Sequence, residues 1–325
     1  MSRKVYSMKA LCLTRYGSLN YFRLTELPDP TPGVQEVLVQ VHASALNPSD
    51  FKVALGEIKF LHGRRFPMPL GNDFSGVVVS VGESVTDFRA GDEVFGFLPY
   101  SPSNQRGAFA EKLVTRSECI AHKPSSTSHS IAAASATAVI TAMQAFRDIG
   151  KLKPGGRVLV TGVSGGVGSV AVQVALRLGA SEVVAIGSDK GLDLAKKLGA
   201  KLVIDRKHED VFASASGSFD VIFDAAAAYR WSQWKSRLKS NGTYVTTLPS
   251  VAFAVDKMKS FVSSSSVGFI GVKPKSKDLK ILAEWLESGL TISLDATVPV
   301  SDVPQALARL KRGEVVGKIA VNVTF

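Results

Sequence analysis

The sequence predicts an α/β protein with a β-rich first part and a doubly wound parallel sheet in its second part. Between Met8 and about Ile120, short β-rich runs are separated by Gly and Pro residues, which is typical of a barrel or sandwich. From Arg157 onward, expected strands and helices alternate, and this alternation indicates a parallel sheet covered by helices. A chain of 325 residues has room for about two domains of roughly 150 residues each.

Apolar patterning places the individual elements. The first part alternates apolar and polar residues in four runs, at Glu36–His42, Gly76–Val81, Glu93–Phe97 and Ala108–Val114. An Ala-rich stretch with helical spacing then covers Ser130–Ile149. In the second part we expect strands at Val158–Thr161, Glu182–Ile186, Leu202–Asp205, Asp220–Phe223 and Gly242–Thr247, with helices at Gly168–Leu178, Gly191–Leu198 and Arg230–Leu238. The last expected elements are strand Val267–Val272, helix Asp278–Ser288, a strand near Val298, helix Val303–Lys311 and strand Lys318–Val323.

The composition excludes several classes of protein. With 45% hydrophobic and 21% charged residues, pervasive disorder is not expected. No apolar run approaches the roughly 20 residues of a spanning helix, so no membrane association is expected. The two cysteines, Cys12 and Cys119, are too few for a disulfide framework, and we therefore expect a reducing compartment, the cytoplasm. The net charge of +11 is scattered without a run of five or six Lys or Arg, so nucleic acid is not expected as the main partner.

A glycine-rich turn indicates a dinucleotide site. The segment Thr161–Ser169, TGVSGGVGS, follows an apolar strand and opens a helix. Glycine lets the backbone approach a pyrophosphate, whose charge then meets the N–H groups of the helix N-terminus. The G-x-G-x-x-G pattern is incomplete, because Val163 stands at its first glycine. The predicted cofactor-binding residues of this turn are consecutive: Ser164, Gly165, Gly166, Val167 and Gly168.

The end of the second strand of this unit predicts which nucleotide is bound. An NAD enzyme usually presents a carboxylate to the ribose 2′-hydroxyl about 20 residues after the glycines. Here Ser188 and Lys190 stand at that point, and Arg206 follows the third strand, so we expect a 2′-phosphate and NADPH. Asp189 works against this preference if its carboxylate faces the ribose.

In their order along the chain, several motifs resemble the medium-chain dehydrogenase/reductase superfamily, and specifically its zinc-free quinone oxidoreductase (zeta-crystallin-like) branch. The similarity runs from Met8 to Val323. The motifs that carry it are Asn47–Asp50, Gly71–Val77, Gly91–Phe95, Gly107–Lys112, Lys153–Gly156, Gly162–Gly168, Leu198–Ala200 and Gly317–Lys318. The resemblance implies a GroES-like catalytic domain, residues 1–123 with 264–325, and a Rossmann NADP-binding domain, residues 124–263.

The superfamily also contains zinc alcohol dehydrogenases, so the metal positions separate the two kinds of enzyme. By the resemblance, the zinc ligands of those enzymes fall on Asn47, Asn72 and Thr137 of this chain. Amides and a hydroxyl are poor zinc ligands beside thiolate and imidazole. No cysteine lies between Phe95 and Glu118, so a four-cysteine structural lobe is not expected either. We therefore expect no metal.

The expected reaction is hydride transfer from NADPH to a quinone or another α,β-unsaturated carbonyl, which needs positioning and donors near the acceptor oxygen. The resemblance implies catalytic and cofactor-contacting roles for Asn47 and Lys52. It also places four further residues along the cofactor, namely Thr141, Leu248, Phe269 and Lys318. A homodimer that pairs the strand around Val267 with its symmetry mate is implied as well.

Three other functions compete with this interpretation. Gly162–Gly166 fits the Gly-x-Ser-x-Gly nucleophile elbow, but His208 is the only histidine after Ser164, so a serine hydrolase is disfavoured. An enoyl-thioester reductase of the same superfamily would share the chemistry and differ in the acceptor. A non-catalytic NADPH-binding or RNA-binding crystallin-like protein is also compatible with the positive net charge.

Overall fold

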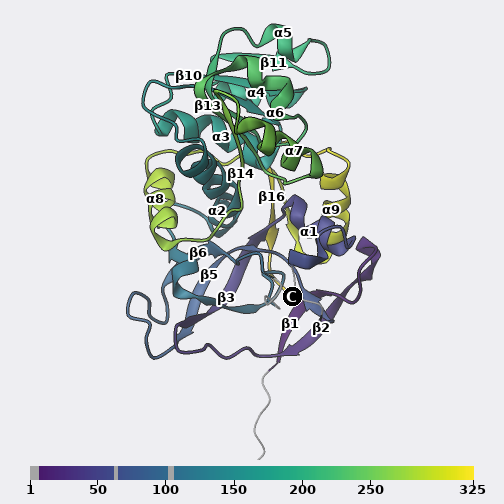
Figure 1. Ribbon diagram of the computed structural model, residues 1–325. Coiled ribbons are helices and arrows are strands. Elements are labelled where there is room, and N and C mark those ends of the chain that lie inside the picture. The colour runs from purple at the N-terminus through teal and green to yellow at the C-terminus, as the bar shows by residue number, and fades with distance from the viewer. Residues whose placement is uncertain (1–6, 62–64, 102–105) are drawn as a thin grey trace, which may run out of the picture. The chain divides into compact units, whose positions relative to one another are not determined.

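The computed structural model describes residues 7–61, 65–101 and 106–325 (Figure 1). The chain divides into two compact units. The first comprises the residues up to Thr137 together with Lys273–Phe325, and the second comprises Ala138–Val272. The domain limits expected from the sequence, at residues 123 and 263, stay a prediction.

The first unit is built on two sheets. The smaller has the strand order β2-β1-β4, from β2 (Phe22–Pro28), β1 (Ser7–Leu13) and β4 (Met68–Pro69). The larger has the order β15-β16-β3-β5-β6-β8, with β7 also paired to β3. Its strands are β15 (Leu294–Pro299), β16 (Lys318–Asn322), β3 (Glu36–Ala45), β5 (Asp73–Val81), β6 (Glu93–Phe97), β8 (Ile120–His122) and β7 (Lys112–Arg116). The mixed α/β class with a GroES-like sheet domain is confirmed.

Two long-range pairings bring distant segments of this unit together. β3 pairs with β5 on one side, so that Ala45 lies opposite Asp73. On the other side β3 pairs with β16, so that Ala45 lies opposite Ala320. The helix α1 (Pro48–Ala54) begins three residues after Ala45, with Asn47 as its N-cap. The start of α1, the start of β5 and the start of β16 are therefore neighbours, although they are far apart in the sequence.

A buried apolar cluster fills the first unit. It includes Val39, Phe74, Phe109 and Leu307, which are all fully buried. The helix α9 (Val303–Lys311) contributes Val303, Ala306 and Leu307 to this cluster, because these residues repeat at helical spacing on one face. The helix α8 (Ser276–Glu287) likewise buries Leu279, Leu282 and Leu286.

The second unit is a six-stranded parallel sheet with the order β11-β10-β9-β12-β13-β14. Its strands are β9 (Arg157–Thr161), β10 (Glu182–Gly187), β11 (Leu202–Asp205), β12 (Phe219–Asp224), β13 (Leu238–Thr246) and β14 (Ser266–Phe269). In chain order this is 3-2-1-4-5-6, the order of dinucleotide-binding sheets, whose ligands bind at the carboxyl ends of the strands. The predicted doubly wound parallel sheet is confirmed.

Helices connect these strands. They are α2 (His129–Gln144), which spans the limit between the units, α3 (Gly166–Arg177), α4 (Lys190–Lys197), α5 (Val211–Ser214), α6 (Trp231–Trp234) and α7 (Val251–Ser260). The expected helix over Arg230–Leu238 is wrong in length, since α6 is followed by a short 3₁₀ segment and Leu238 already pairs with Phe219 in the sheet. The helix α7 was not predicted.

Both cysteines are free and buried. Burial is the main cause that raises the pKa of Cys12 to about 11, and it raises the pKa of Cys119 to the same value. Among the described residues, no helix is long and apolar enough to cross a bilayer.

Candidate functional site

The glycine-rich turn joins β9 to α3 in the second unit. Gly162 has φ +71°, a conformation that favours glycine, and its carbonyl accepts a 2.9 Å hydrogen bond from Gly165 N. A Cβ on Gly168 would lie 2.2 Å from Gly162 O, so this close approach requires glycine. A Cβ on Gly165 would meet only Gly162 O, at 3.4 Å, which leaves open space beside the turn.

The first turn of α3 offers hydrogen-bond donors beside this open space. Within the described chain, no backbone hydrogen bond outside the helix engages the N–H groups of Gly166, Val167 and Gly168. Ser164 is held in place by its hydroxyl, which donates a 3.1 Å hydrogen bond to Ser188 O. The predicted residues of the turn therefore lie together as a cradle that fits an anionic pyrophosphate.

The predicted phosphate-binding side chains lie at the carboxyl ends of β10 and β11. Arg206 N donates to Gly187 O over 3.0 Å, which brings the residue after β11 beside Ser188. Ser188 is buried, whereas Lys190, the first residue of α4, and Arg206 are exposed. Sequence reasoning missed Lys207, whose Nζ lies 2.6 Å from Asp189 Oδ2. The hydrogen bond from Lys207 is the main cause that lowers the pKa of the Asp189 carboxyl.

A buried carboxylate organises the loop after β12. Asp224 is fully buried and accepts hydrogen bonds from Thr161 Oγ1 at 2.5 Å and Tyr244 Oη at 2.7 Å. It also accepts from the backbone N–H groups of Ala228 and Tyr229, at 3.2 and 2.8 Å. Burial, and next the negative charge of Asp224, raise the pKa of Tyr244. One carboxylate thus fixes the ends of β9 and β13 and the loop that follows β12.

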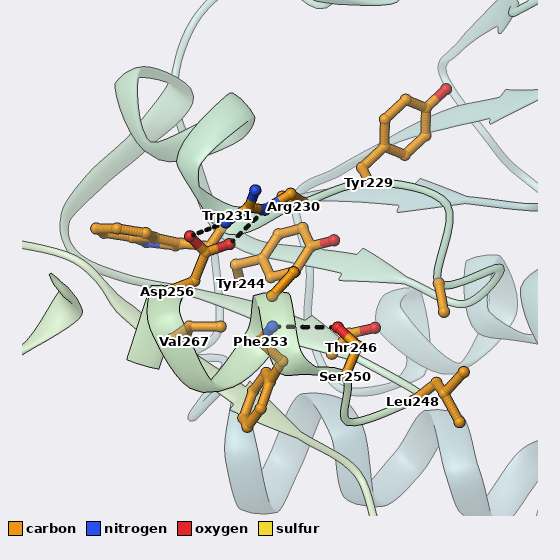
Figure 2. Close-up of a pocket in the computed structure, with 12 residues that line it drawn as sticks. Tyr229, Arg230, Trp231, Tyr244, Thr246, Leu248, Ser250, Phe253, Asp256 and Val267 are labelled. Atoms are coloured by element: carbon orange, nitrogen blue, oxygen red, sulfur yellow. Dashed lines mark hydrogen bonds and ion pairs between the residues drawn. The ribbon is translucent and has the colours of Figure 1, made fainter. Parts of the chain in front are cut away.

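A small pocket lies next to this loop (Figure 2). Its walls come from the loop, from β13, from α7 and from β14, and it is lined by Tyr229, Arg230, Trp231, Tyr244, Thr246, Leu248, Ser250, Phe253, Asp256 and Val267, with Ala227 and Ala252. Figure 2 shows Arg230 and Asp256 facing each other, and Arg230 Nη2 lies 3.1 Å from Asp256 Oδ1. Its volume of about 60 Å³ is far below the roughly 300–1,000 Å³ of sites that enclose a small molecule. The pocket therefore cannot by itself hold a nucleotide.

The first unit contains a buried polar cluster around Asn47, defined by Asn47, Asp50, Asp73, Thr137 and Lys318. Each of these residues is at most 6% exposed. Asp73 is the centre of the cluster. It accepts from Asn47 Nδ2 at 2.9 Å and Lys318 Nζ at 3.1 Å through Oδ2, and from Thr137 N at 2.9 Å and Thr137 Oγ1 through Oδ1. The predicted residues Asn47 and Lys318 are in direct contact, since Lys318 Nζ donates to Asn47 Oδ1 over 2.7 Å.

Asp50 and Tyr100 adjoin the cluster. Asp50 Oδ2 accepts from Asn47 N over 2.7 Å and so caps the first turn of α1. Burial is the main cause that raises the pKa of Asp50 to about 7, and the negative charge of Asp73 adds to it. Tyr100 Oη lies 3.0 Å from Ser49 Oγ, and burial, then the charge of Asp50, raise the pKa of Tyr100. The sequence did not indicate Asp50, Asp73 or Tyr100 as site residues.

Four predicted residues lie outside these networks. Lys52 is half-buried in the last turn of α1, and within the described chain no hydrogen bond or ion pair engages its ammonium. Thr141 is buried in α2. Leu248 and Phe269 are each 41% exposed, and Phe269 packs edge-on against Phe253 at 5.6 Å between ring centroids. Phe269 ends β14 and Leu248 lies shortly before α7 in the second unit.

Of the three positions at which the resemblance places zinc ligands, Asn47 and Thr137 form hydrogen bonds to Asp73. At the third, Asn72 Nδ2 donates to Leu98 O at 3.0 Å, and its Oδ1 is buried without a hydrogen-bond partner among the described residues. The residues that the structure describes include no group of three or more His, Cys, Asp or Glu side chains placed to hold a metal ion. That the protein holds no metal stays a prediction.

Comparison with known proteins defines the family. Residues 33–125 match the alcohol dehydrogenase GroES-like domain, and residues 198–321 match a zinc-binding dehydrogenase domain. The chain is 31% identical to the NAD(P)H oxidoreductase RTN4IP1, mitochondrial, of Bos taurus, over 97% of this chain and 89% of that protein. The chain belongs to the medium-chain dehydrogenase/reductase superfamily, in its quinone oxidoreductase (zeta-crystallin-like) branch. It is therefore an enzyme of an oxidoreductase family that uses NAD(P)H.

Two further relatives cover nearly the whole of this chain. It is 33% identical to the 2-methylene-furan-3-one reductase of Solanum lycopersicum, over 97% of this chain and 79% of that protein. The quinone oxidoreductase of Coxiella burnetii has a similar structure, with a TM-score of 0.88 and 27% identity over 98% of this chain and 100% of the other. RTN4IP1 is named as a mitochondrial protein, so the cytoplasmic location expected from the sequence is not confirmed.

Proposed function

We propose that this chain is an NADPH-dependent, zinc-independent reductase that transfers hydride to quinones or other α,β-unsaturated carbonyls. The observation that carries the proposal is the carboxyl edge of the parallel sheet, where the glycine cradle of α3 lies close in the fold to Ser188, Lys190 and Arg206. The two relatives named for a quinone and an unsaturated furanone support the acceptor class.

Each group of residues has a separate task in this proposal. The N–H groups of Gly166, Val167 and Gly168 bind the pyrophosphate, and Lys190 and Arg206 bind the 2′-phosphate with charge-assisted hydrogen bonds. Thr141, Leu248 and Phe269 contact the nucleotide. NADPH supplies the hydride. The preference for NADPH is helped by Lys207, because its ammonium neutralises the Asp189 carboxylate, which would otherwise repel a phosphate.

The residues of the first unit act on the acceptor. When hydride adds to the β-carbon of an enone, negative charge develops on the carbonyl oxygen, and a nearby N–H donor stabilises it. We assign this contact to the amide of Asn47, and we assign to Lys52, five residues further along the chain, a positive charge that acts on the same oxygen. The proton that completes the saturated product comes from water. No step in this scheme needs a metal ion.

The experiment is a measurement of NADPH consumption with a panel of quinones, short enones and enoyl thioesters, each with and without a chelator. We expect turnover with at least one quinone or short enone and no effect of the chelator. Turnover with enoyl thioesters alone would identify the enoyl-thioester reductase instead. Chelator-sensitive oxidation of simple alcohols would show that the metal-free assignment is wrong.

A cofactor-binding variant provides the internal control for this panel. Gly168→Ala places a methyl group where Gly162 O lies 2.2 Å away, so the cradle must distort. We expect the variant to lose NADPH binding, measured by quenching of protein fluorescence, together with all turnover. Gly289→Ala serves as the matched control, since no atom lies within 4 Å of its added Cβ, although its φ of +87° makes some loss of stability expected.

A further inference from the structure

Lys318 is a buried lysine whose hydrogen bonds are all made inside the protein. It opens β16 and is 4% exposed. Its Nζ donates to Leu46 O at 3.0 Å, to Asn47 Oδ1 at 2.7 Å and to Asp73 Oδ2 at 3.1 Å. An ammonium has three protons, and these three acceptors engage all of them. Lys318 therefore acts on its neighbours and has no donor left for a ligand.

These contacts determine the orientation of the Asn47 amide. An ammonium can only donate, so the oxygen Oδ1 must face Lys318, and Nδ2 then faces Asp73, to which it donates over 2.9 Å. Asp73 is itself held by the backbone N–H and the hydroxyl of Thr137. One of the two N–H groups of Asn47 Nδ2 remains, and no hydrogen bond within the described chain uses it.

The positive charge changes how strongly this remaining N–H donates. A hydrogen bond from an ammonium to an amide oxygen is charge-assisted and draws electron density away from the amide nitrogen. In a buried environment such polarisation strengthens the next hydrogen bond along the chain of donors. Lys318 also pairs with Asp73 and offsets the negative charge that this carboxylate brings beside Nδ2, so the Asn47 amide is a better donor toward an anionic oxygen with Lys318 present than without it.

The position of this lysine is informative within the family. Two of the three positions that correspond to zinc ligands in related alcohol dehydrogenases are tied to Lys318, Asn47 directly and Thr137 through Asp73. The positive charge beside these two positions is thus supplied by a side chain, the ammonium of Lys318. An ammonium carries a positive charge but cannot accept an oxygen ligand as a metal does, so its effect must pass through Asn47.

We propose that Lys318 is a positioning residue that holds and polarises the Asn47 amide, so that its remaining N–H stabilises the negative charge on the acceptor oxygen. The inference rests on the proposed function. In the reaction, hydride forms a C–H bond at the β-carbon, the C=C electron pair moves toward the carbonyl oxygen, and a proton from water completes the α-carbon. Lys318 neither gains nor loses a proton.

The test compares Lys318→Met with a matched buried lysine. Lys123 lies in the same unit, its side chain is 4% exposed against 5% for Lys318, and its Nζ donates to Thr127 O and Pro124 O and pairs with Glu93. Among the described residues, no hydrogen bond or ion pair joins Lys123 to Asn47. For wild type, Lys318→Met and Lys123→Met we would measure melting temperature, the Kd of NADPH by fluorescence, and kcat and KM with the best acceptor of the panel.

We expect Lys318→Met to lower kcat by about 10- to 100-fold, less than the loss of a direct oxyanion donor, because Asn47 itself remains. The Kd of NADPH should stay within about twofold. With deuterated NADPH the kinetic isotope effect on kcat should increase, because hydride transfer becomes more fully rate-limiting. Lys123→Met should lower the melting temperature and leave kcat and the isotope effect unchanged. In Lys318→Ala, methylammonium chloride should restore part of kcat, whereas the same concentration of sodium chloride should not.

The outcomes distinguish a failure of this inference from a failure of the proposed function. If wild type oxidises NADPH with no acceptor of the panel, the proposed function fails and the inference with it. If wild type turns over and Lys318→Met has the kcat of Lys123→Met, only the inference fails. A large rise in the Kd of NADPH with kcat preserved would overturn it too, in favour of a direct cofactor contact. If Lys318→Met does not fold, Lys318→Gln, which keeps donors without charge, must show the same loss of kcat.

Discussion

Lys207 Nζ lies 2.6 Å from Asp189 Oδ2, at the end of β10 where the nucleotide ribose is expected. Asp189 has φ +54° and precedes α4, so its carboxylate is directed by an unusual backbone conformation for a residue with a side chain. This ion pair neutralises the carboxylate of Asp189, which would otherwise disfavour NADPH. Under the proposed function, cofactor preference would therefore depend on a residue outside the segment from Ser188 to Lys190.

Lys207→Ala should raise the KM for NADPH roughly two- to fivefold, the scale of an exposed ion pair, and leave the KM for NADH unchanged. The reason is that the freed Asp189 carboxylate repels a 2′-phosphate. Adding Asp189→Asn to this variant should restore the wild-type value. Steady-state kinetics with both nucleotides measure the effect, and equal changes in the two KM values would contradict it.

The double variant Lys190→Ala, Arg206→Ala should raise the KM for NADPH by roughly 10- to 100-fold, because two charge-assisted hydrogen bonds to phosphate are lost. The KM for NADH should change far less. Lys196→Ala, Lys197→Ala in the last turn of α4 removes equal charge farther from the phosphate-binding edge and provides the control. If both nucleotides respond alike, there is no phosphate pocket at this edge.

Asp50→Asn should flatten the dependence of stability on pH. The pKa of Asp50 is raised to about 7 in the native state, against roughly 4 in an unfolded chain. Between these values the native state binds more protons, so its free energy of unfolding falls as pH rises from about 4 to about 7. An asparagine still accepts from Asn47 N and does not titrate. The melting temperature of the variant, relative to wild type, should therefore rise across this window.

Thermal melts at several pH values measure this effect. The melting temperature should shift by about 2–4 °C for each kcal/mol of change in the free energy of unfolding. Asp193→Asn on the exposed side of α4 is the control and should keep the wild-type slope. An unchanged slope in Asp50→Asn would show that Asp50 is ionised throughout the window.

We expect the protein to form a homodimer through β14, which stands at the end of the sheet order and pairs only with β13 among the described strands. The chain just before β14 exposes Phe261 and Val262, at 77% and 94%. Phe261→Asp, Val262→Asp should therefore produce a monomer in sedimentation velocity. Leu24→Asp, which changes an equally apolar exposed side chain of β2, should not. A wild-type monomer would refute the expected assembly.

The parallel sheet could be predicted because its signals are local. The strands β9 to β12 are short apolar runs, and the glycines of the turn before α3 mark a place where the chain passes closely over itself. By contrast, α7 has an inverted pattern. It exposes Val251 and Met258 and buries Asp256 and Ser260, because Asp256 pairs with Arg230. A search for an apolar face at helical spacing misses such a helix.

The polar cluster of the first unit could be predicted only in part. Asn47 and Lys318 were indicated by family resemblance, but nothing in the sequence shows that they touch, since 271 positions separate them. Asp73 lies in the motif Gly71–Val77, but nothing in that motif indicates that it joins Asn47, Thr137 and Lys318. Its role arises from the pairing of β3 with both β5 and β16, which is a property of the folded sheet.

The burial of both thiols has a consequence if the acceptors are electrophiles, as the proposed function requires. Unsaturated carbonyls alkylate cysteine through its thiolate, and burial raises the pKa of both thiols to about 11, so the thiolate is scarce at neutral pH. Cys12 and Cys119 are also 0% and 3% exposed, and the chain has no other cysteine. Under the proposed function, alkylation of these two thiols by the acceptor is therefore expected to be slow, and folding stability would set the lifetime of the enzyme under a high load of reactive alkenes.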